Sequence, residues 1–477
     1  MRRFRRLFNS EEPSFPRFRL PFLILTICVN LRNLRIYIFL FSSLWLCSAC
    51  PSRPQPSQWN VIWISIDDVK AASLGCYGRE RNTSPRLDAL ARQGVRFQNC
   101  ITQAGWTLPS YASMLTSRYP YETVFTREYI RHLQGETEAA RSRDPYRLPE
   151  MNRHWYGKLR PGFPTLAEVL ARAGFRTAAW TNNQWLSPAL SGMDRGFGEY
   201  HFTDQPDAFY EPADRTLAAV TTWMEKHQGE RFFIFVHLMD VHKPWQKHPE
   251  FGFGERPLDQ YEAELRFTDQ EIGKLVERLK ELKLWERTLL VVNSDHGEGV
   301  YEERERFVGH GGGVIPDLIR VPLLIVGPGL PRGKVIEPTV RNLDIFPTIL
   351  DLLQVKGAPP MQGRSLTPWW SKPAGPNPSD YLPAVTMGMI KGPEQISFVT
   401  GRWQVVLIPA YQSVQVLPWA APDVARGLAP ETEEQAVSSA QNFVRGMVAA
   451  MGQVTLPPPV NLDPETEKKL KALGYLQ

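Results

Sequence analysis

Two pairs of adjacent metal-ligand residues each follow a short apolar run. Asp67 and Asp68 come directly after residues 59–66. Asp295 and His296 follow a second such run. Neighbouring carboxylates repel each other unless a cation lies between them. Oxygen ligands suit Ca²⁺, Mg²⁺ or Mn²⁺ and an imidazole favours Mn²⁺ or Zn²⁺, so the four residues together predict one divalent cation, although each pair alone is more often a solvated turn.

Thr107 is a candidate nucleophile. It lies in the segment Gly-Trp-Thr-Leu-Pro-Ser, which begins at Gly105 and leads into a helix-like run at residues 111–115. A metal lowers the pKa of a nearby hydroxyl, and a helix N-terminus stabilises anionic substrate oxygens, so a hydroxyl at such a place is set up for attack. The alternative is an ordinary helix start in which the Thr side chain has no chemical role.

Three histidines and one aspartate complete the candidate set. His237, Asp240 and His242 lie in the run His-Leu-Met-Asp-Val-His, which ends another apolar segment. A histidine can protonate a leaving alcohol or, when charged, hold an anionic oxygen. This spacing places the three side chains on different sides of a loop, so we do not expect them to share one ion. His310 lies among glycines at residues 309–313, which lets backbone approach a ligand, or is incidental to a flexible loop.

The candidates stand where the strands of an open α/β sheet would end. Continuous apolar runs indicate parallel strands that are buried on both faces, and such strands present their ligands at their carboxyl ends. Helical segments alternate with the runs, and we expect Ser84 to cap a helix with Pro85 in its first turn. The sequence thus predicts a large α/β/α sandwich with a mostly parallel central sheet and a smaller C-terminal α+β subdomain.

The expected elements can be given by residue number. Strands are predicted at residues 59–66, 176–181, 231–238, 288–293, 321–326, 395–400 and 403–409. Helices are predicted at residues 84–93, 164–173, 215–227, 261–284, 343–353 and 464–473. Residues 420–460 carry little signal for either.

The first 50 residues are typical of an export signal or membrane anchor. Basic residues accompany two apolar runs, at residues 20–31 and 36–50, each short for a membrane span. The small residues before Cys50 resemble a bacterial lipobox with Cys50 lipidated, although Cys47 stands where an aliphatic residue is preferred. We expect an exported, periplasmic or cell-envelope protein held at the membrane by an anchor or lipid. The expected organisation is an export segment at 1–50, a linker at 51–58, a catalytic domain at 59–375 and a C-terminal subdomain at 376–477.

The composition is that of a globular protein of 477 residues. Apolar residues make up 43% and charged residues 22%, and the net charge of +5 comes largely from the N-terminal segment. The body carries no basic tract, so we expect no nucleic-acid partner. Cys76 and Cys100 are the cysteines of the body, and they could form one bridge or remain buried thiols.

The ordered motifs resemble those of the sulfatase family within the alkaline phosphatase superfamily. The resemblance extends over roughly residues 59–370, and an ordered set of this kind is highly specific. The segments that carry it are residues 60–68, 74–78, 82–91, 94–97, 106–116, 237–245, 294–298, 320–329, 344–351 and 363–366.

The resemblance implies a role for each matched position. Metal ligands would be Asp67, Asp68, Asp295 and His296. Thr107 would be the nucleophile and a further ligand. His242 would contact the substrate or leaving group, and His310 would replace a basic residue on the transferred group. His237, Asp240 and Asn183 are candidates for the substrate or for support of the ligands.

Departures from the family pattern concern the nucleophile. Most sulfatases have a Cys or Ser that becomes formylglycine, followed four residues later by Arg, whereas this chain has Thr107 and Tyr111. Thr cannot yield the aldehyde, so we expect no formylglycine. The family's Gly-Lys-Trp-His stretch is replaced by residues 181–185, which lack the Lys and His that grip sulfate.

The chemistry therefore leaves several readings open. The first is a metal-dependent hydrolase of a sulfate or phosphate-type ester, with a small-molecule, glycan or lipid substrate. A phosphodiesterase, or a phosphoethanolamine or phosphoglycerol transferase, would use a similar Thr with an Asp-His pair. A non-catalytic binding protein on the same fold is the alternative from another class.

Overall fold

The computed structural model describes most of the chain from Gln55 onward. The described residues are 55–134, 155–203, 210–300, 309–372, 383–390, 392–400, 402–409, 412–419, 432–453, 455–459 and 462–472. The chain divides into two units, Met1–Arg53 and Pro54–Gln477, and every described element belongs to the second. The expected export segment, Cys50 and the first part of the expected linker lie outside the described residues.

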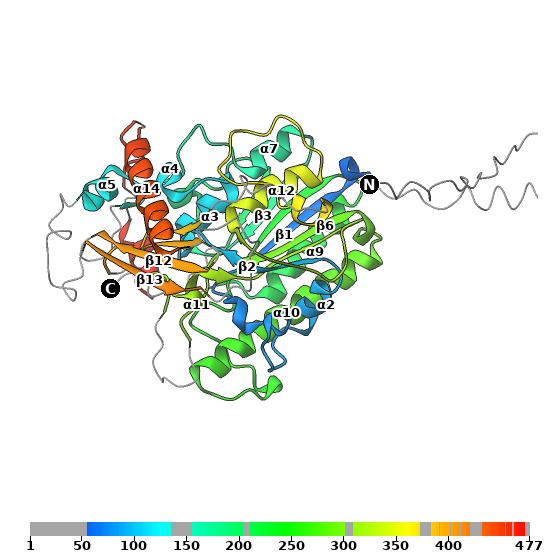
Figure 1. Cartoon of the computed structure of the whole chain (residues 1–477). Helices are drawn as coiled ribbons and strands as arrows, with labels where there is room; N and C mark the ends of the chain where they lie inside the picture. The colour runs from blue at the N-terminus through cyan, green and yellow to red at the C-terminus, as the bar shows by residue number, and fades with distance from the viewer. Residues whose placement is uncertain are drawn as a thin grey trace, which may run out of the picture. The chain divides into compact units, whose positions relative to one another are not determined.

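A nine-stranded sheet forms the centre of the described part of this unit (Figure 1). Its order is β4-β3-β5-β1-β6-β8-β2-β7, with β9 paired to β2. Strands β4, β3, β5, β1 and β6 pair in parallel, whereas β8 runs antiparallel to both β6 and β2. The strands are β1 (Asn60–Ile66), β2 (Val95–Ile101), β3 (Arg176–Thr181), β4 (Glu199–Phe202), β5 (Phe232–Leu238), β6 (Thr288–Ser294), β7 (Arg320–Val321), β8 (Leu323–Val326) and β9 (Lys334–Arg341).

Both faces of the sheet are covered, which confirms the predicted sandwich. Along β1, Val61 and Trp63 pack into one hydrophobic core, and Ile62 and Ile64 pack into a second. Helices α3, α7 and α12 contribute to the first core, and α2, α9 and α10 to the second. Every residue of β1 is buried for this reason, and its apolar run is continuous instead of alternating.

The helices lie close to the predicted positions. The α-helices are α2 (Pro85–Ala91), α3 (Thr107–Thr116), α4 (Pro120–Thr123), α5 (Arg127–Leu133), α7 (Leu166–Arg172), α8 (Pro188–Ser191), α9 (Ala213–His227), α10 (Pro257–Glu281), α11 (Pro316–Ile319), α12 (Ile345–Leu352), α13 (Pro368–Ser371), α14 (Glu433–Met451) and α15 (Pro464–Ala472). In the described part of the chain, no helix combines the length and apolar character that a membrane crossing requires.

The expected cap of α2 is wrong. The Ser84 hydroxyl instead accepts the N–H of Gly75 (2.8 Å) and makes no cap bond to the helix. The carboxylate of Asp269 on α10 accepts the N–H groups of Arg86 (3.0 Å) and Leu87 (2.7 Å). A distant helix therefore satisfies the first turn of α2, and this ties the two helices together.

A second sheet follows in the chain. Its antiparallel order is β10-β11-β12-β13, and its strands are β10 (Ala384–Thr386), β11 (Ile396–Thr400), β12 (Trp403–Ile408) and β13 (Ser413–Pro418). Helix α14, which the sequence did not predict, packs on β12 (Figure 1). Val385 and Phe398 of this sheet share a core with Trp106, so the second sheet packs against the region that precedes α3.

Candidate active site

Three neighbouring strand ends bring the predicted residues together at one edge of the sheet. β1 lies between β5 and β6, and its last residues, Ser65 and Ile66, pair with His237 on β5 and Ser294 on β6, respectively. The chain then enters the loop at Asp67. The site side chains that are buried at this edge are Asp67, Asp68, Thr107, Asn183, His237, Asp240, His242, Asp295 and His296, and His310 is nearly so.

Asp67, Asp295 and His296 form a first group. The Nε2 atom of His296 lies 3.4 Å from Asp67 Oδ1 and 3.2 Å from Asp295 Oδ2. One ligand atom from each residue lies within 4.8 Å of the others. Asp67 Oδ1 and Asp295 Oδ2 are buried and accept no hydrogen bond from the described residues. Positive charge between these atoms would satisfy them, so the donor set fits a divalent cation.

Thr107 lies beside this group as the first residue of α3. Its Oγ1 atom is 3.5 Å from His296 Nε2. The amide of Asn183 bridges Asp67 and Thr107, because its Nδ2 donates to Asp67 Oδ2 (3.0 Å) and to Thr107 Oγ1 (3.4 Å). The Asn183 Oδ1 accepts the N–H of Trp185 in the short helix η5 (Gln184–Leu186), which fixes the orientation of the amide. Asn183 thus links the hydroxyl to the carboxylate.

Asp68, His242 and His310 form a second group. His310 Nδ1 lies 3.1 Å from Asp68 Oδ1, and His242 Nε2 lies 3.9 Å from Asp68 Oδ2. One ligand atom from each of the three lies within 4.8 Å of the others. Glu298 joins them, since its Oε2 is 3.1 Å from His310 Nδ1. Adjacent residues in the sequence, Asp67 and Asp68, therefore belong to different groups.

His237 and Asp240 do not enter either group as ligands. His237 Nε2 contacts Asp67 Oδ2 (3.1 Å), and its Nδ1 contacts Asn182 Oδ1 (3.1 Å). Asp240 instead accepts the N–H of Ala213 at the start of α9 (2.8 Å). Burial raises the pKa of Asp240 to about 8. His237 orients a carboxylate of the site, and Asp240 serves the fold.

Burial and mutual charge shift the pKa values of the first group in opposite directions. Burial would raise the pKa of Asp67, but its contact with His237 and the charge of His296 lower it. Burial raises the pKa of Asp295 well above its ordinary value, and the charge of Asp67 adds to the shift. Burial would lower the pKa of His296, but Asp295 and Asp68 raise it to about 9. Positive charge is therefore favoured where the two carboxylates meet the imidazole.

Backbone from residues 311 and 388–390 supports the segment that precedes Thr107. The N–H of Gly311 donates to the carbonyl of Gly105, and the N–H of Ile390 donates to the carbonyl of Gly311, both at 2.9 Å. The indole N–H of Trp106 donates to the carbonyl of Gly388 (2.8 Å). Gly311 has a φ of 75°, and a Cβ there would lie 2.3 Å from the Ile390 side chain, so the position requires glycine.

Comparison with known proteins supports the same interpretation. Residues 59–355 match the family model described as Sulfatase. The chain belongs to the sulfatase family. The ulvan-active sulfatase of Formosa agariphila is 26% identical over 354 residues, which cover 66% of this chain and 65% of that protein. Arylsulfatase D of Homo sapiens is 24% identical over 429 residues, which cover 69% of this chain and 71% of that protein. The aligned region spans about two thirds of each of these sulfatases.

Solved structures show the same fold. Ps i-CgsB, solved in complex with k-i-k-neocarrahexaose, has a TM-score of 0.64 at 20% identity over 87% of this chain and 98% of that chain. A protein of the alkaline phosphatase superfamily from Vibrio parahaemolyticus has a TM-score of 0.59 at 18% identity over 84% and 89%. The sulfatase-family chain therefore has the alkaline-phosphatase-like architecture.

Two residues of the site were not among the sequence candidates. Glu298 stands in the same loop as Asp295 and His296, and Asn182 precedes Asn183. A carboxylate three residues after a ligand pair was the available signal for Glu298. Nothing in the sequence distinguished Asn182, because its role depends on the position of His237 on the neighbouring strand.

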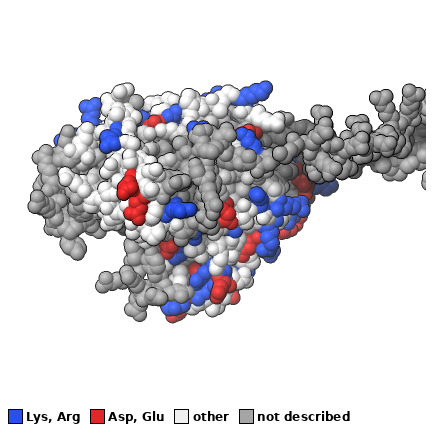
Figure 2. Space-filling view, in the orientation of Figure 1, with Lys and Arg blue, Asp and Glu red and all other residues white. Residues whose placement is uncertain are grey.

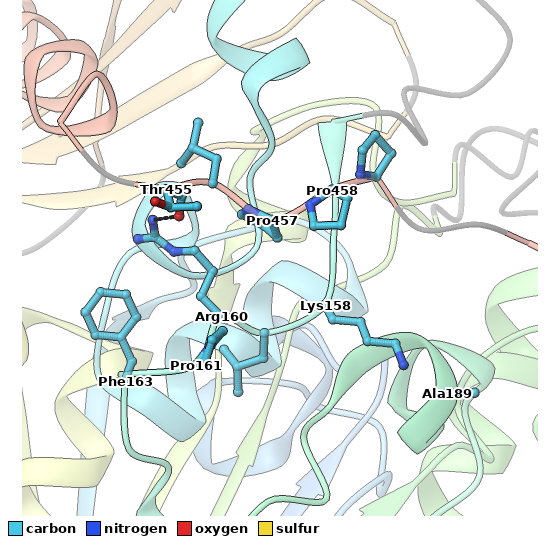
Figure 3. A pocket seen from close by; sticks show the side chains of 11 residues that line it. Lys158, Arg160, Pro161, Phe163, Ala189, Thr455, Pro457 and Pro458 are labelled. Carbon is cyan, nitrogen blue, oxygen red and sulfur yellow. Dashed lines mark hydrogen bonds between the residues drawn. The ribbon is translucent and has the colours of Figure 1, made fainter.

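The structure also has a pocket whose lining residues belong to neither group. It is lined by residues 158–161, Phe163, Ala189 and residues 455–459, and Arg160 donates to the carbonyl of Thr455 (3.0 Å) within it (Figure 3). None of the candidate site residues lines it. On the face shown in Figure 2, the described basic and acidic side chains are interspersed.

Proposed function

We propose that this sulfatase-family chain is a metal-dependent hydrolase that uses the hydroxyl of Thr107 on a sulfate or phosphate-type ester. The observation that carries the proposal is the position of Thr107 Oγ1, 3.5 Å from His296 Nε2 at the N-terminus of α3. The cation would be held by Asp67, Asp295 and His296 with Thr107 as a further ligand, since two buried carboxyl oxygens face the imidazole there. Family membership supports the sulfuric ester hydrolase class.

A divalent cation at this place would lower the pKa of a hydroxyl beside it and draw charge from a sulfuryl or phosphoryl oxygen. The chain's own groups set the geometry. Asn183 holds the Thr107 oxygen through its Nδ2 at 3.4 Å. The first turn of α3 directs its positive end toward the oxygen that gains charge. Thr107 Oγ1 is therefore positioned and activated by groups that reach it from separate loops.

The reaction would proceed in two displacements. In the first, Thr107 Oγ1 bonds to the sulfur or phosphorus atom, its proton passes to solvent, and the bond to the alcohol breaks as the alcohol takes up a proton. In the second, water attacks the same sulfur or phosphorus atom, which releases sulfate or phosphate and restores the Thr hydroxyl. A Thr ester cannot leave by forming an aldehyde, so the second displacement is required.

The test uses intact-mass analysis of the protein after brief incubation with p-nitrophenyl sulfate, p-nitrophenyl phosphate or bis-p-nitrophenyl phosphate in Mn²⁺, Zn²⁺ or Ca²⁺. We expect nitrophenol release and an adduct on Thr107 with the mass of one sulfuryl group, of one phosphoryl group or, from the diester, of one nitrophenyl phosphoryl group. Thr107→Val should lower kcat by about 10³-fold or more because the nucleophile is lost. The matched control is Ser113→Ala, which removes another buried hydroxyl of α3.

The possible results of this experiment distinguish between the alternative activities. An adduct from the sulfate ester alone would make the chain a sulfatase with a Thr nucleophile, and an adduct from the phosphates would make it a phosphatase or phosphodiesterase on the same fold. A Thr107→Val variant with the wild-type rate would overturn the assignment. Bound metal without turnover of any ester would support the non-catalytic binding protein.

The substrate and location form the last part of the proposal. The Formosa relative is named as active on ulvan, which supports a sulfated glycan as one substrate class beside small-molecule and lipid esters. The N-terminal 50 residues support export to the periplasm or cell envelope, with Cys50 as the lipidated residue.

A further inference from the structure

We propose that Glu264 is a positioning residue, because its carboxylate fastens the loop that follows His242 to helix α10. The loop comprises residues 243–256, between the turn after β5 and the first residue of α10. The inference rests on the proposed hydrolysis and on the role that the family resemblance gives to His242, which is contact with the substrate or the leaving group. Glu264 was not among the sequence candidates.

The carboxylate of Glu264 is buried on α10 and bonded to groups from two other segments. Glu264 is 1% exposed. Its Oε1 accepts the backbone N–H of Gln246 in the loop and the hydroxyl of Tyr210 (3.2 Å), which precedes α9. Its Oε2 lies 2.9 Å from Nε2 of His248, also in the loop. A buried carboxylate needs such donors to offset the loss of water, so the loop and α10 hold each other in place.

His248 faces a carboxylate with each of its ring nitrogens. Nε2 contacts Glu264, and Nδ1 lies 3.1 Å from Glu250 Oε1. An ionised carboxylate only accepts hydrogen bonds, so both nitrogens carry protons and the ring is charged. Burial would lower the pKa of His248, but Glu264 and Glu250 raise it. The ring also stacks on Phe267 of α10, with ring centroids 4.7 Å apart, so charge and packing fasten the loop to the same helix.

The position of the loop sets the orientation of His242. The Nδ1 atom of His242 lies 2.5 Å from the carbonyl oxygen of Lys243, the first residue of the loop. The indole N–H of Trp245 donates to the carbonyl of Val241 (2.8 Å), which closes a turn around His242. The N–H that the carboxylate on α10 accepts belongs to the next residue. A shift of the loop would therefore move the carbonyl that orients the imidazole.

Helix α10 also holds the residue that His242 faces. The Nε2 atom of His242 lies 3.9 Å from Asp68 Oδ2. Tyr261, one turn before Glu264 on α10, donates its hydroxyl proton to the carbonyl of Asp68 (2.9 Å) and packs edge-on against Trp245, with ring centroids 6.1 Å apart. One helix thus positions both partners, and removal of the Glu264 carboxylate would release the loop while the bond to Asp68 stays.

The first measurement is hydrogen–deuterium exchange of the full-length protein, which needs no substrate. Peptides that cover residues 243–256 should exchange about 10-fold faster or more in Glu264→Ala than in wild type, because the Gln246 N–H loses a charged, buried acceptor. Peptides that cover β6 should exchange as in wild type. Glu264→Gln should show a smaller change, since its amide oxygen can still accept this N–H.

The matched control is Glu262→Ala. Glu262 lies on the same helix and is also 1% exposed, but its carboxylate pairs with Arg79 (2.6 Å) and Arg81 (2.8 Å) and not with the loop. Its removal should leave the exchange of residues 243–256 at the wild-type rate. His248→Ala, which removes one donor to the carboxylate, takes the place of Glu264→Ala if that variant does not fold.

The second measurement compares two leaving groups in the ester type, sulfate or phosphate, that wild type hydrolyses. A misplaced proton donor slows the release of a poor leaving group most, since nitrophenolate is a stable anion and phenolate is less so. Glu264→Ala should lower kcat for the phenyl ester by about 100-fold, and for the p-nitrophenyl ester by about 10-fold or less, with little change in KM. A purely structural role would lower both rates equally.

Wild-type exchange of residues 243–256 in Glu264→Ala would overturn the inference. Faster exchange with unchanged kcat, or with equal losses for the two esters, would also overturn it. Absence of turnover in wild type would instead overturn the proposed hydrolysis, and the exchange rates would still decide whether Glu264 fastens the loop.

Discussion

At the scale of single residues, Asn183 connects the proposed nucleophile, Thr107, to a proposed metal ligand, Asp67. Its Nδ2 contacts both Asp67 Oδ2 and Thr107 Oγ1, and its Oδ1 is held by the N–H of Trp185. The amide can therefore not rotate without losing a backbone bond. In place of the Lys and His that other sulfatases have in this region, the chain has an uncharged side chain that orients an oxygen.

Asn183→Ala should lower kcat by about 10- to 100-fold, because groups that orient ligands typically contribute this much to activity or metal affinity. The measurement is steady-state hydrolysis of the p-nitrophenyl ester that the wild type turns over. Asn99→Ala is the control, since Asn99 on β2 is also buried and its amide donates to a backbone carbonyl outside the site. Equal losses in the two variants would show that Asn183 acts through stability alone.

The sequence revealed the residues of the site but not their grouping. The pairs at Asp67 and Asp295 could be predicted because apolar runs identify parallel strands, whose ends meet. The separation of Asp68 from Asp67 could not be predicted, since it depends on the φ angle of Asp68 and on which edge of the His296 ring each carboxylate faces. The role of Asp240 at the start of α9 depends likewise on the fold.

At the scale of elements, the turn at Gly388 and Met389 is fixed by one buried carboxylate. Glu394 accepts both of their N–H groups (2.6 and 2.9 Å) and the hydroxyl of Tyr129 (3.1 Å). The carbonyl of Gly388 in turn accepts the indole N–H of Trp106, the residue before α3. Glu394 therefore stabilises the turn that supports the start of α3 without contacting the candidate site.

Glu394 should make the free energy of unfolding depend on pH. Burial raises its pKa to about 7 from the ordinary value of 4.5. The unfolded chain releases the proton near pH 4.5 and the folded chain near 7, so the contribution of Glu394 to stability is fully present below 4.5 and is lost as pH rises to 7, by at most about 3 kcal/mol. Urea unfolding between pH 5 and 8 should show a flatter profile for Glu394→Gln than for wild type. The exposed Glu433→Gln should leave the profile unchanged, and an unchanged profile in Glu394→Gln would refute the prediction.

The predicted elements and the observed ones differ for physical reasons. Strands β1, β5 and β6 were predictable because each is buried on both faces. Helix α14 was not, because the residues that it buries include two alanines among many polar positions, so its apolar stripe is weak. The cap of α2 was missed because its acceptor, Asp269, lies on a distant helix.

At the scale of the whole molecule, the proposed export segment would determine where the enzyme works. The α/β/α sandwich contains the candidate site, and the expected export signal lies in residues 1–50. Membrane attachment would then depend on one thiol, Cys50, and the catalytic part would remain the same without it.

Lipidation at Cys50 can be tested by expressing the full chain in a Gram-negative bacterium fed a clickable palmitate analogue. Wild type should be labelled and should sediment with membranes, because acyl chains supply the hydrophobic anchor. Cys50→Ala should be unlabelled, and Cys47→Ala should be labelled as wild type. A labelled Cys50→Ala variant, or an unlabelled wild type, would refute lipidation at this residue.

The backbone groups that hold the segment before Thr107 also bear on biosynthesis: the N–H of Gly311 donates to the carbonyl of Gly105, and the carbonyl of Gly388 accepts the indole N–H of Trp106. Thr107 is synthesised in the first quarter of the chain, whereas Gly311 emerges in the third quarter and Gly388 in the last. A ribosome-bound or truncated chain that ends before residue 388 has every proposed ligand of the cation but lacks the carbonyl that accepts the Trp106 indole N–H. The segment before Thr107 therefore gains its last backbone support late in translation, long after the proposed export segment has been synthesised.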